Sequence, residues 1–247
     1  MSSGPCEPLR SSGGPDGLTT QHITDMLAND NGGRLLNAIT DMVNLLLAGK
    51  FDKEIAMIIY NGRRLAISKK DDVIQSIAVG NILRRLAVKC TNKYVINGRS
   101  QALQPTQLGV GVAGGAEAAI HTMRQHFKLL PACHAVVKLD FTNAFNSIRR
   151  ELLLETVVKN TPELHHFTFS TTLINGNQII LSREGSQQGD PLSSLEFFES
   201  IQPLLTEVNS EVDIGFMDDT SLLADLDTPE MDITKIIKIT GLKLKHL

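Results

Sequence analysis

The chain has 247 residues, of which 42% are hydrophobic and 21% are charged. This balance is ordinary for a folded protein and excludes a chain that is disordered throughout. The sequence holds no run of about 18 apolar residues, so it predicts no membrane-spanning helix. The N-terminus lacks the regions of a signal peptide, and we therefore expect an intracellular protein, nuclear or cytoplasmic, that is not secreted.

The charges are unevenly distributed, although the net charge is only −3. Residues 1–134 hold 15 Lys and Arg against 10 Asp and Glu, whereas residues 135–247 hold 9 against 17. A basic segment of this kind can neutralise phosphates, or it can belong to ordinary solvated helix faces. The three cysteines are widely spaced and predict no disulfide framework.

The first part of the chain alternates between helical and strand patterns. Residues 1–17 are rich in Ser, Gly and Pro, which is typical of a flexible leader. From Leu35 apolar residues recur at helical spacing until Gly49, which predicts a helix. The β-branched runs 55–60 and 73–79 favour strands, and the second of them follows a basic turn.

A second helical pattern covers residues 82–90, and a third follows the Gly-rich tract 109–115. The tract lacks the Lys-Ser/Thr of a P-loop and a suitable preceding strand. We therefore expect it to form the N-terminal turn of a helix rather than a phosphate site.

In the second half of the chain, the β-branched run at residues 135–141 predicts a strand with Asp140 near its end, followed by a helix over residues 146–158. The dipeptide Asn175-Gly176 lies between two apolar segments and is a strong signal for a hairpin.

Residues 182–190 are expected to form a loop that leads into a helix ending near Val208. Two short strands, 212–217 and 220–224, then flank Asp218-Asp219. This spacing predicts a tight hairpin with both carboxylates at its tip.

Asp140, Asp218 and Asp219 together suggest chemistry, although each residue alone is also common in turns and caps. Phosphoryl and nucleotidyl transfer use hard oxygen ligands that hold two Mg²⁺ ions about 4 Å apart. Carboxylates at the ends of neighbouring strands supply such ligands. The sequence therefore points to a two-metal site in the second half of the chain.

Three segments occur in a recognisable order: Val137-Lys138-Leu139-Asp140-Phe141-Thr142-Asn143-Ala144-Phe145-Asn146, then Ser186-Gln187-Gln188-Gly189-Asp190-Pro191-Leu192, then Gly215-Phe216-Met217-Asp218-Asp219. They resemble the polymerase motifs of reverse transcriptases from non-LTR (LINE-type) retrotransposons. Residues 241–244 are similar to the start of a fourth motif, and residues 12–18 and 64–71 are similar to finger segments of that family.

The resemblance implies a role for each matching residue. Asp140, Asp218 and Asp219, with the carbonyl group of Phe141, would hold two Mg²⁺ ions, with Mn²⁺ as an alternative. Phe145, five residues after Asp140, would act as a steric gate against a ribose 2′-hydroxyl.

Further residues would contact the incoming deoxynucleotide. Gln188 and Gly189 would lie along it, and Lys69 or Lys70 would reach its triphosphate. The partners implied are an RNA template, a DNA primer and deoxynucleotides, with no membrane and no obligate protein partner.

The resemblance implies an α+β fold of the right-hand polymerase type, with an antiparallel palm sheet backed by helices. We expect a leader at residues 1–17, fingers mostly at 18–134 and a palm at 135–247, with the thumb absent. The function implied is that of an RNA-directed DNA polymerase.

Two departures from the family pattern support an alternative. Gln75 stands where the family usually has an arginine, and Glu196 stands where an apolar residue is usual. With no thumb expected, the alternative is a catalytically silent retroelement remnant that binds nucleic acid or a partner. An RNA-copying polymerase or a two-metal hydrolase is disfavoured by Phe145 and by the match around Asp190-Pro191.

Overall fold

The structure is a computed structural model that describes residues 12–29, 31–68, 74–131, 133–168, 172–175, 178–216, 219–225 and 228–245. The chain divides into two compact units, which we describe separately. The first unit comprises residues 1–87 and 170–181, and the second comprises residues 88–169 and 182–247. The expected boundaries of leader, fingers and palm stay a prediction.

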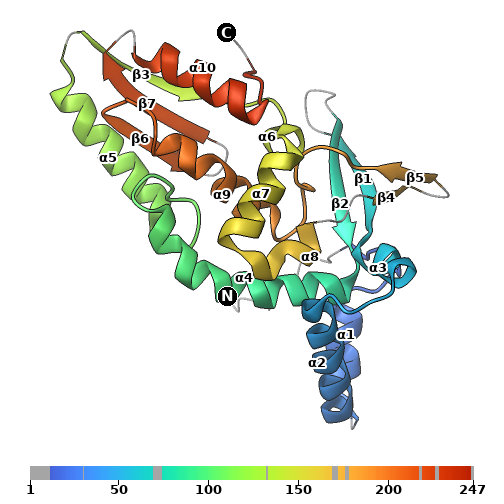
Figure 1. The fold of residues 1–247 in the computed structure, drawn as a ribbon. Coiled ribbons are helices and arrows are strands. Elements are labelled where there is room, and N and C mark those ends of the chain that lie inside the picture. Colours follow the sequence, from blue (N-terminus) through green and yellow to red (C-terminus); the bar gives the residue numbers. More distant parts are fainter. Residues whose placement is uncertain are drawn as a thin grey trace. The chain divides into compact units, whose positions relative to one another are not determined.

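The first unit begins with three helices, α1 (Thr20–Leu27), α2 (Gly32–Ala48) and α3 (Lys53–Tyr60) (Figure 1). The predicted helix ending at Gly49 is α2, and Gly49 caps it with a φ of +63°, a conformation that glycine adopts at little cost. The α1 and α2 helices pack against each other.

Helix α3 corrects the strand expected at residues 55–60. A short apolar run fits a strand or a buried helix equally well, and tertiary contacts decide between them. Here Ile59 and Tyr60 are buried, and the Tyr60 hydroxyl donates to the Leu46 carbonyl at 3.0 Å, which joins the end of α3 to α2.

The sheet of the first unit contains β1 (Gly62–Ser68), β2 (Ile74–Gly80), β4 (Thr172–Asn175) and β5 (Gln178–Leu181) in the order β2-β1-β4-β5. The β1–β2 pair and the β4–β5 pair are antiparallel, whereas β1 and β4 run parallel. The hairpin predicted at Asn175-Gly176 is confirmed in its strands β4 and β5. The strand expected at residues 73–79 is β2, but its partner is β1 rather than residues 55–60. The turns of both hairpins lie outside the described residues.

The stretch just before α1 contacts this unit. Gly14 packs so closely on the backbone that an added Cβ would lie 2.5 Å from the Gly80 carbonyl oxygen. The Arg85 guanidinium donates to the Ser12 carbonyl at 3.2 Å. Residues 12–17 of the expected leader thus have defined contacts, and residues 1–11 lie outside the described part.

The second unit is larger and mixes helices with one sheet. Helix α4 (Ile82–Leu103) starts in the first unit and continues into the second. The other elements are α5 (Gly115–Leu129), β3 (His134–Leu139), α6 (Ala144–Ser147), α7 (Arg150–Asn160), η1 (Pro162–Leu164), α8 (His165–Thr168), α9 (Ser193–Leu205), β6 (Val212–Phe216), β7 (Asp219–Asp225) and α10 (Thr228–Thr240).

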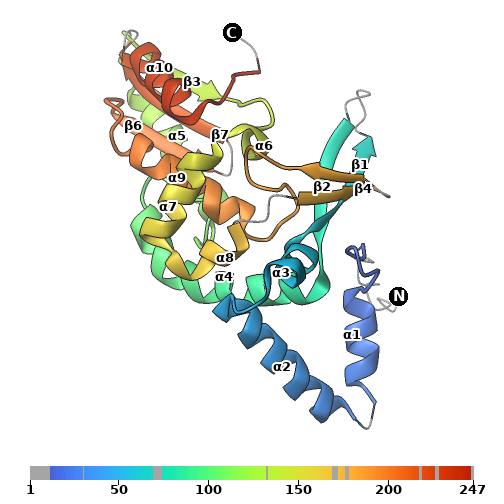
Figure 2. The same cartoon turned by 45° about the vertical axis from the view of Figure 1, so that its right-hand side comes forward.

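The sheet of this unit is antiparallel, with the order β3-β7-β6. Helix α10 packs against β7 and α5 packs against β6 (Figures 1 and 2). The tract at residues 109–115 leads into α5 as expected, since α5 begins at Gly115. Leu139 of β3 and Leu222 of β7 lie on the same face of the sheet and are almost completely buried, so this face contributes to the core.

The helical part of the core centres on α9, which packs against α7 and also contacts α6 and α10. Phe197 and Phe198 of α9 are fully buried, and Leu153 and Val157 of α7 are buried as well. Burying a large apolar side chain contributes roughly 1.5–3 kcal/mol. The burial of these four side chains therefore makes the α7–α9 contact a stabilising part of the core.

The helix expected over residues 146–158 is interrupted, because α6 ends at Ser147 and α7 begins at Arg150. Long-range backbone hydrogen bonds hold the break. The Ile148 carbonyl accepts from the Gly185 N–H at 2.9 Å, and the Arg149 N–H donates to the Thr240 carbonyl at 3.0 Å. Neither partner is visible in the local sequence pattern.

In the part of the chain that the structure describes, no helix has the length and apolar character needed to cross a membrane.

Candidate active site

Two of the predicted catalytic carboxylates lie at the same end of the second unit's sheet. Leu139 of β3 is paired with Thr220 of β7, and Asp140 and Asp219 are the next residues of the two segments. Continuing the antiparallel register by one position places Asp140 opposite Asp219. Directly opposed residues of antiparallel strands point to the same face, so both carboxylates belong to one face of the sheet.

Asp219 is also paired with Phe216 across the β6–β7 hairpin. Only Met217 and Asp218 separate the two in the sequence, and both lie outside the described residues. We expected both acids at the tip of the hairpin, whereas Asp219 is the first paired residue of β7. Its position is therefore fixed by the ladder rather than by the turn.

Each of these carboxylates has a lysine partner. The Lys245 Nζ lies 2.6 Å from Asp140 Oδ1, and the Lys138 Nζ lies 3.1 Å from Asp219 Oδ1. Lys138 is opposite Ser221, so its contact with Asp219 is a diagonal cross-strand pair. All four side chains are between 46% and 62% exposed. Exposed pairs of this kind contribute only about 0–1 kcal/mol to stability.

Residues 241–245 run along the segment that carries Asp140. Phe141 and Leu244 form an antiparallel bridge. The Thr142 N–H donates to the Lys243 carbonyl at 2.7 Å, and the Lys245 N–H donates to the Asp140 carbonyl at 2.9 Å. This bridge uses the backbone groups of Asp140 and Thr142, and leaves the carbonyl of Phe141 outside the pairing.

The donor set suits a hard divalent cation. Asp140 and Asp219 provide carboxylate oxygens on one face, and a backbone carbonyl at Phe141 is a further oxygen ligand of the kind that Mg²⁺ accepts. Among the described residues no three His, Cys, Asp or Glu side chains are grouped closely enough to bind a metal. Asp218, the third predicted acid, lies outside those residues.

Phe145 is held by packing and by its backbone. Its ring lies 4.9 Å from the ring of Phe197 on α9, measured between centroids. Its carbonyl accepts hydrogen bonds from the Ser186 N–H at 2.7 Å and from the Ser186 hydroxyl at 3.3 Å. The side chain is only partly buried, so a rigid aromatic ring stands near the loop that carries Gln188.

Asn146 holds Gln188, and sequence reasoning gave it no role. The Asn146 Oδ1 accepts from the Gln188 N–H at 3.4 Å, and the Asn146 Nδ2 donates to the Gln188 side-chain oxygen at 3.4 Å. Gly189 follows with a φ of +99°, which only glycine adopts readily. Asn146 lies in the first motif, but its contact with the second motif could not be read from either segment alone.

Arg150 fixes the other end of the same loop. Its guanidinium donates to the Gly185 carbonyl at 2.7 Å and to the Ser182 hydroxyl at 3.2 Å. Burial lowers the pKa of this arginine, and the negative charge of Glu196 partly opposes the effect. Glu196, which departs from the family pattern, thus favours the charge of a partly buried arginine that holds the loop.

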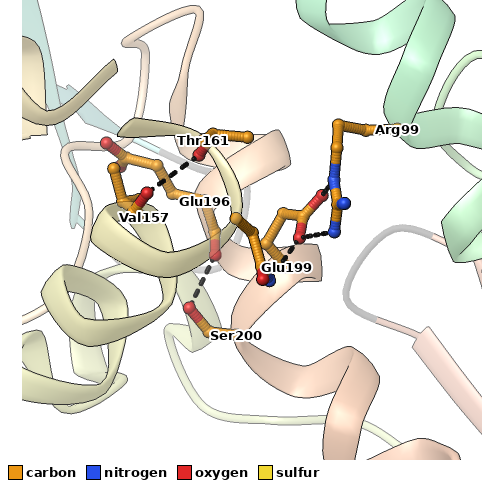
Figure 3. Close-up of polar contacts among 7 residues, drawn as sticks. Arg99, Val157, Thr161, Glu196, Glu199 and Ser200 are labelled. Carbon is orange, nitrogen blue, oxygen red and sulfur yellow. Dashed lines mark hydrogen bonds and ion pairs between the residues drawn. The ribbon is translucent and has the colours of Figure 1, made fainter. Parts of the chain in front are cut away.

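Helix α9, which follows this loop in the sequence, carries a buried carboxylate that forms an ion pair with a partly buried arginine (Figure 3). Glu199 is 1% exposed and accepts two hydrogen bonds of 2.6 Å from the Arg99 guanidinium of α4. Asn160 of α7 donates a further one at 2.9 Å. The hydrogen bonds that Arg99 donates to Glu199 raise the pKa of Arg99. Three helices are therefore fixed by one carboxylate.

Lys69 and Lys70 lie outside the described residues, so the structure does not place them. Gln75 pairs through its backbone with Ile67 across the β1–β2 hairpin.

An antiparallel sheet with opposed aspartates at one end, backed by helices, defines the palm of a right-hand polymerase. The reverse transcriptase (RNA-dependent DNA polymerase) family model matches residues 67–245. The chain belongs to this family. That assignment confirms the reverse transcriptase resemblance and the fold class inferred from the sequence.

Solved structures with a similar fold include telomerases from Candida tropicalis. Apo telomerase matches at 11% identity with a TM-score of 0.54, covering 73% of this chain and 41% of the telomerase. Apo telomerase truncated from its C-terminal domain matches at 14% identity with a TM-score of 0.51, covering 73% and 46%. Telomerase in complex with the TWJ fragment of telomeric RNA matches at 13% identity with a TM-score of 0.55, covering 76% and 40%.

The chain thus spans less than half the length of these telomerases, and at such identities the similarity shows the fold alone. A search of curated proteins gave no match.

Proposed function

We propose that this chain is the catalytic part of an RNA-directed DNA polymerase, which adds deoxynucleotides to the 3′-hydroxyl of a DNA primer on an RNA template. The observation that carries the proposal is the facing pair Asp140 and Asp219 at one end of β3 and β7. The three ordered motifs favour a retroelement of the non-LTR type as its origin, acting inside the cell.

Two Mg²⁺ ions, with Mn²⁺ as an alternative, would be held by Asp140, Asp218, Asp219 and the carbonyl of Phe141. Such ions activate the attacking oxygen and stabilise negative charge on the transferred phosphoryl group. The contribution of the chain is to fix the carboxylates before the substrate arrives. The β3–β7 register and the bridge to Leu244 support that role, because they hold both aspartates from the backbone.

The incoming nucleotide would lie between Phe145 and the loop of Gln188 and Gly189. The contact of the Phe145 ring with Phe197 makes it a rigid obstacle to a 2′-hydroxyl. Asn146 orients the amide of Gln188, and the glycine allows close approach of the backbone. Lys69 or Lys70 would bind the triphosphate by charge attraction.

Primer extension on an RNA template with Mg²⁺ and deoxynucleotides tests this function. The variants Asp140→Asn and Asp219→Asn should extend at least about a hundredfold more slowly, because each loses a charged ligand. Asp225→Asn is the matched control, since Asp225 is exposed at the other end of β7 and caps Thr228. It should keep the activity of the wild type.

The outcomes separate the alternatives. Extension that survives Asp140→Asn and Asp219→Asn would contradict the proposed site. No extension by the wild-type chain, with the primer–template still bound, would favour the catalytically silent remnant. Preferential incorporation of ribonucleotides would favour an RNA-copying polymerase and would contradict the role given to Phe145.

A further inference from the structure

Both described carboxylates of the candidate site are paired with lysines of the same chain, and the two lysines reach them differently. Lys138 lies on β3, where the register with β7 fixes its position beside Asp219. Lys245 comes from a segment 105 residues away from Asp140 in the sequence. Both contacts join distant parts of the chain, but only Lys245 reaches its carboxylate from outside the β3-β7-β6 sheet.

The backbone delivers the Lys245 side chain to Asp140. The Lys245 N–H donates to the Asp140 carbonyl at 2.9 Å, and the Lys245 Nζ donates to Oδ1 of the same residue at 2.6 Å. The bridge between Phe141 and Leu244 holds the neighbouring residues in line. The ammonium group is therefore placed on a predicted metal ligand by the main chain.

A lysine ammonium and a divalent cation repel each other strongly when they bind one carboxylate oxygen. The Asp140 side chain is 49% exposed, so a cation can approach it from the solvent while Lys245 is still in place. Lys245, 46% exposed, has room to move away.

We propose that Lys245 is a built-in counter-ion of Asp140 that competes with the divalent cation for this carboxylate. The inference rests on the proposed function and adds a form of regulation to the same site. Because the coupling of two binding events is reciprocal, the cation that binds Asp140 releases the Lys245 ammonium, and loss of that ammonium strengthens binding of the cation.

The test measures metal binding directly, without a polymerase assay. Mn²⁺ is titrated into the full chain, and free Mn²⁺ is followed by its paramagnetic resonance signal. The variant Lys245→Gln should bind Mn²⁺ about two- to fivefold more tightly than the wild type, which is the range of exposed ion pairs. Lys245→Arg keeps the positive charge and should bind like the wild type.

Lys243→Gln is the matched control. Lys243 is exposed on the same segment, and the contact that it makes to the first motif is through its carbonyl, to Thr142. It removes the same charge two positions away and should change Mn²⁺ affinity less than Lys245→Gln. In an Asp140→Asn background the gain from Lys245→Gln should disappear, because the shared carboxylate is gone.

Two negative results are distinguishable. If the wild type binds Mn²⁺ and Lys245→Gln gains no more than Lys243→Gln, the inference is wrong and the metal site stands. If neither the wild type nor any variant binds Mn²⁺, the inference and the proposed function both fail. Circular dichroism of each variant establishes that it is folded as the wild type is.

Discussion

Asp213 of β6 is an ionisable residue whose position in the sheet is unfavourable for its charge. Its Oδ2 is buried, and no hydrogen-bond partner for it is found among the described residues. Burial raises the pKa of Asp213, and a hydrogen bond with the side chain of Thr106 opposes this only in part. A buried charged group whose hydrogen bonds are only partly satisfied costs free energy on folding.

We predict that Asp213→Asn stabilises the protein at pH 7. A raised folded-state pKa means that the native state holds the proton more tightly than the unfolded state does, so ionisation of Asp213 destabilises the fold as pH rises. The gain from the neutral amide should be on the order of 1 kcal/mol at pH 7. It should shrink towards zero as pH falls below about 4, where both states of the wild type are protonated.

Urea unfolding of the wild type and Asp213→Asn at pH 7 and at low pH measures this difference. A variant that is less stable than the wild type at pH 7, or whose effect is the same at every pH, would show that the Asp213 charge is not the unfavourable group.

At the scale of elements, the loop at residues 182–190 depends on Gly185. This glycine has a φ of +64°, and an added Cβ would lie 2.5 Å from the Asn146 Cα and would overlap the carbonyl oxygen of Phe145. The N–H of Gly185 also donates to the Ile148 carbonyl. The loop can therefore lie this close to the first motif only with glycine at this position.

We predict that Gly185→Ala costs about 2–4 kcal/mol of unfolding free energy, from a strained backbone conformation and a steric clash. Gly17→Ala is the control, because Gly17 has a similar φ of +72° but no atom within 4 Å of an added Cβ. It should cost only about 1 kcal/mol. Chemical denaturation measures both losses of unfolding free energy. Equal losses in the two variants would mean that the loop can move away from the first motif at no cost.

The elements that the sequence predicted are those whose signals are local. The Asn-Gly hairpin, the helix that ends at Gly49 and the strand before Asp140 all follow from nearby residues, and the structure has them. The helix at Lys53–Tyr60 was missed because its apolar run is short. The break between α6 and α7 was missed because its hydrogen-bond partners, Gly185 and Thr240, are far away in the sequence.

The same limit applies to the candidate site at the scale of the whole chain. The sequence motifs were enough to predict the aspartates, because the type of residue at a motif position determines which ligands it can offer to a metal. The register that places Asp219 opposite Asp140 follows from strand pairing over about 80 residues of separation, which no periodicity reveals. The lysine on Asp140 and the amide of Asn146 on Gln188 are contacts between segments, and only the folded chain brings them together.

The charge distribution of the whole chain leads to a prediction about nucleic-acid binding. Binding that rests on phosphate contacts weakens as the salt concentration rises. A plot of log K against log salt concentration has a negative slope, and this slope becomes less steep by about 1 for each phosphate contact removed. Arg63 and Arg64 are exposed neighbours on β1, so their side chains point to opposite faces and only one can meet a given strand of nucleic acid. The variant Arg63→Ala/Arg64→Ala should therefore bind an RNA–DNA primer–template more weakly, with a salt slope that is less steep by about 1.

Fluorescence anisotropy of a labelled primer–template at several KCl concentrations measures the slope. Arg124→Ala/Lys128→Ala is the matched control, since it removes the same charge from exposed positions of α5, which belongs to the second compact unit. This control should lower the affinity slightly, because some long-range attraction to the nucleic acid is lost. It should leave the salt slope nearly unchanged, because no bound phosphate loses its partner. If both double variants lower the slope equally, then the basic excess of the first half acts only as a diffuse field. The nucleic acid would in that case be bound by residues other than Arg63 and Arg64.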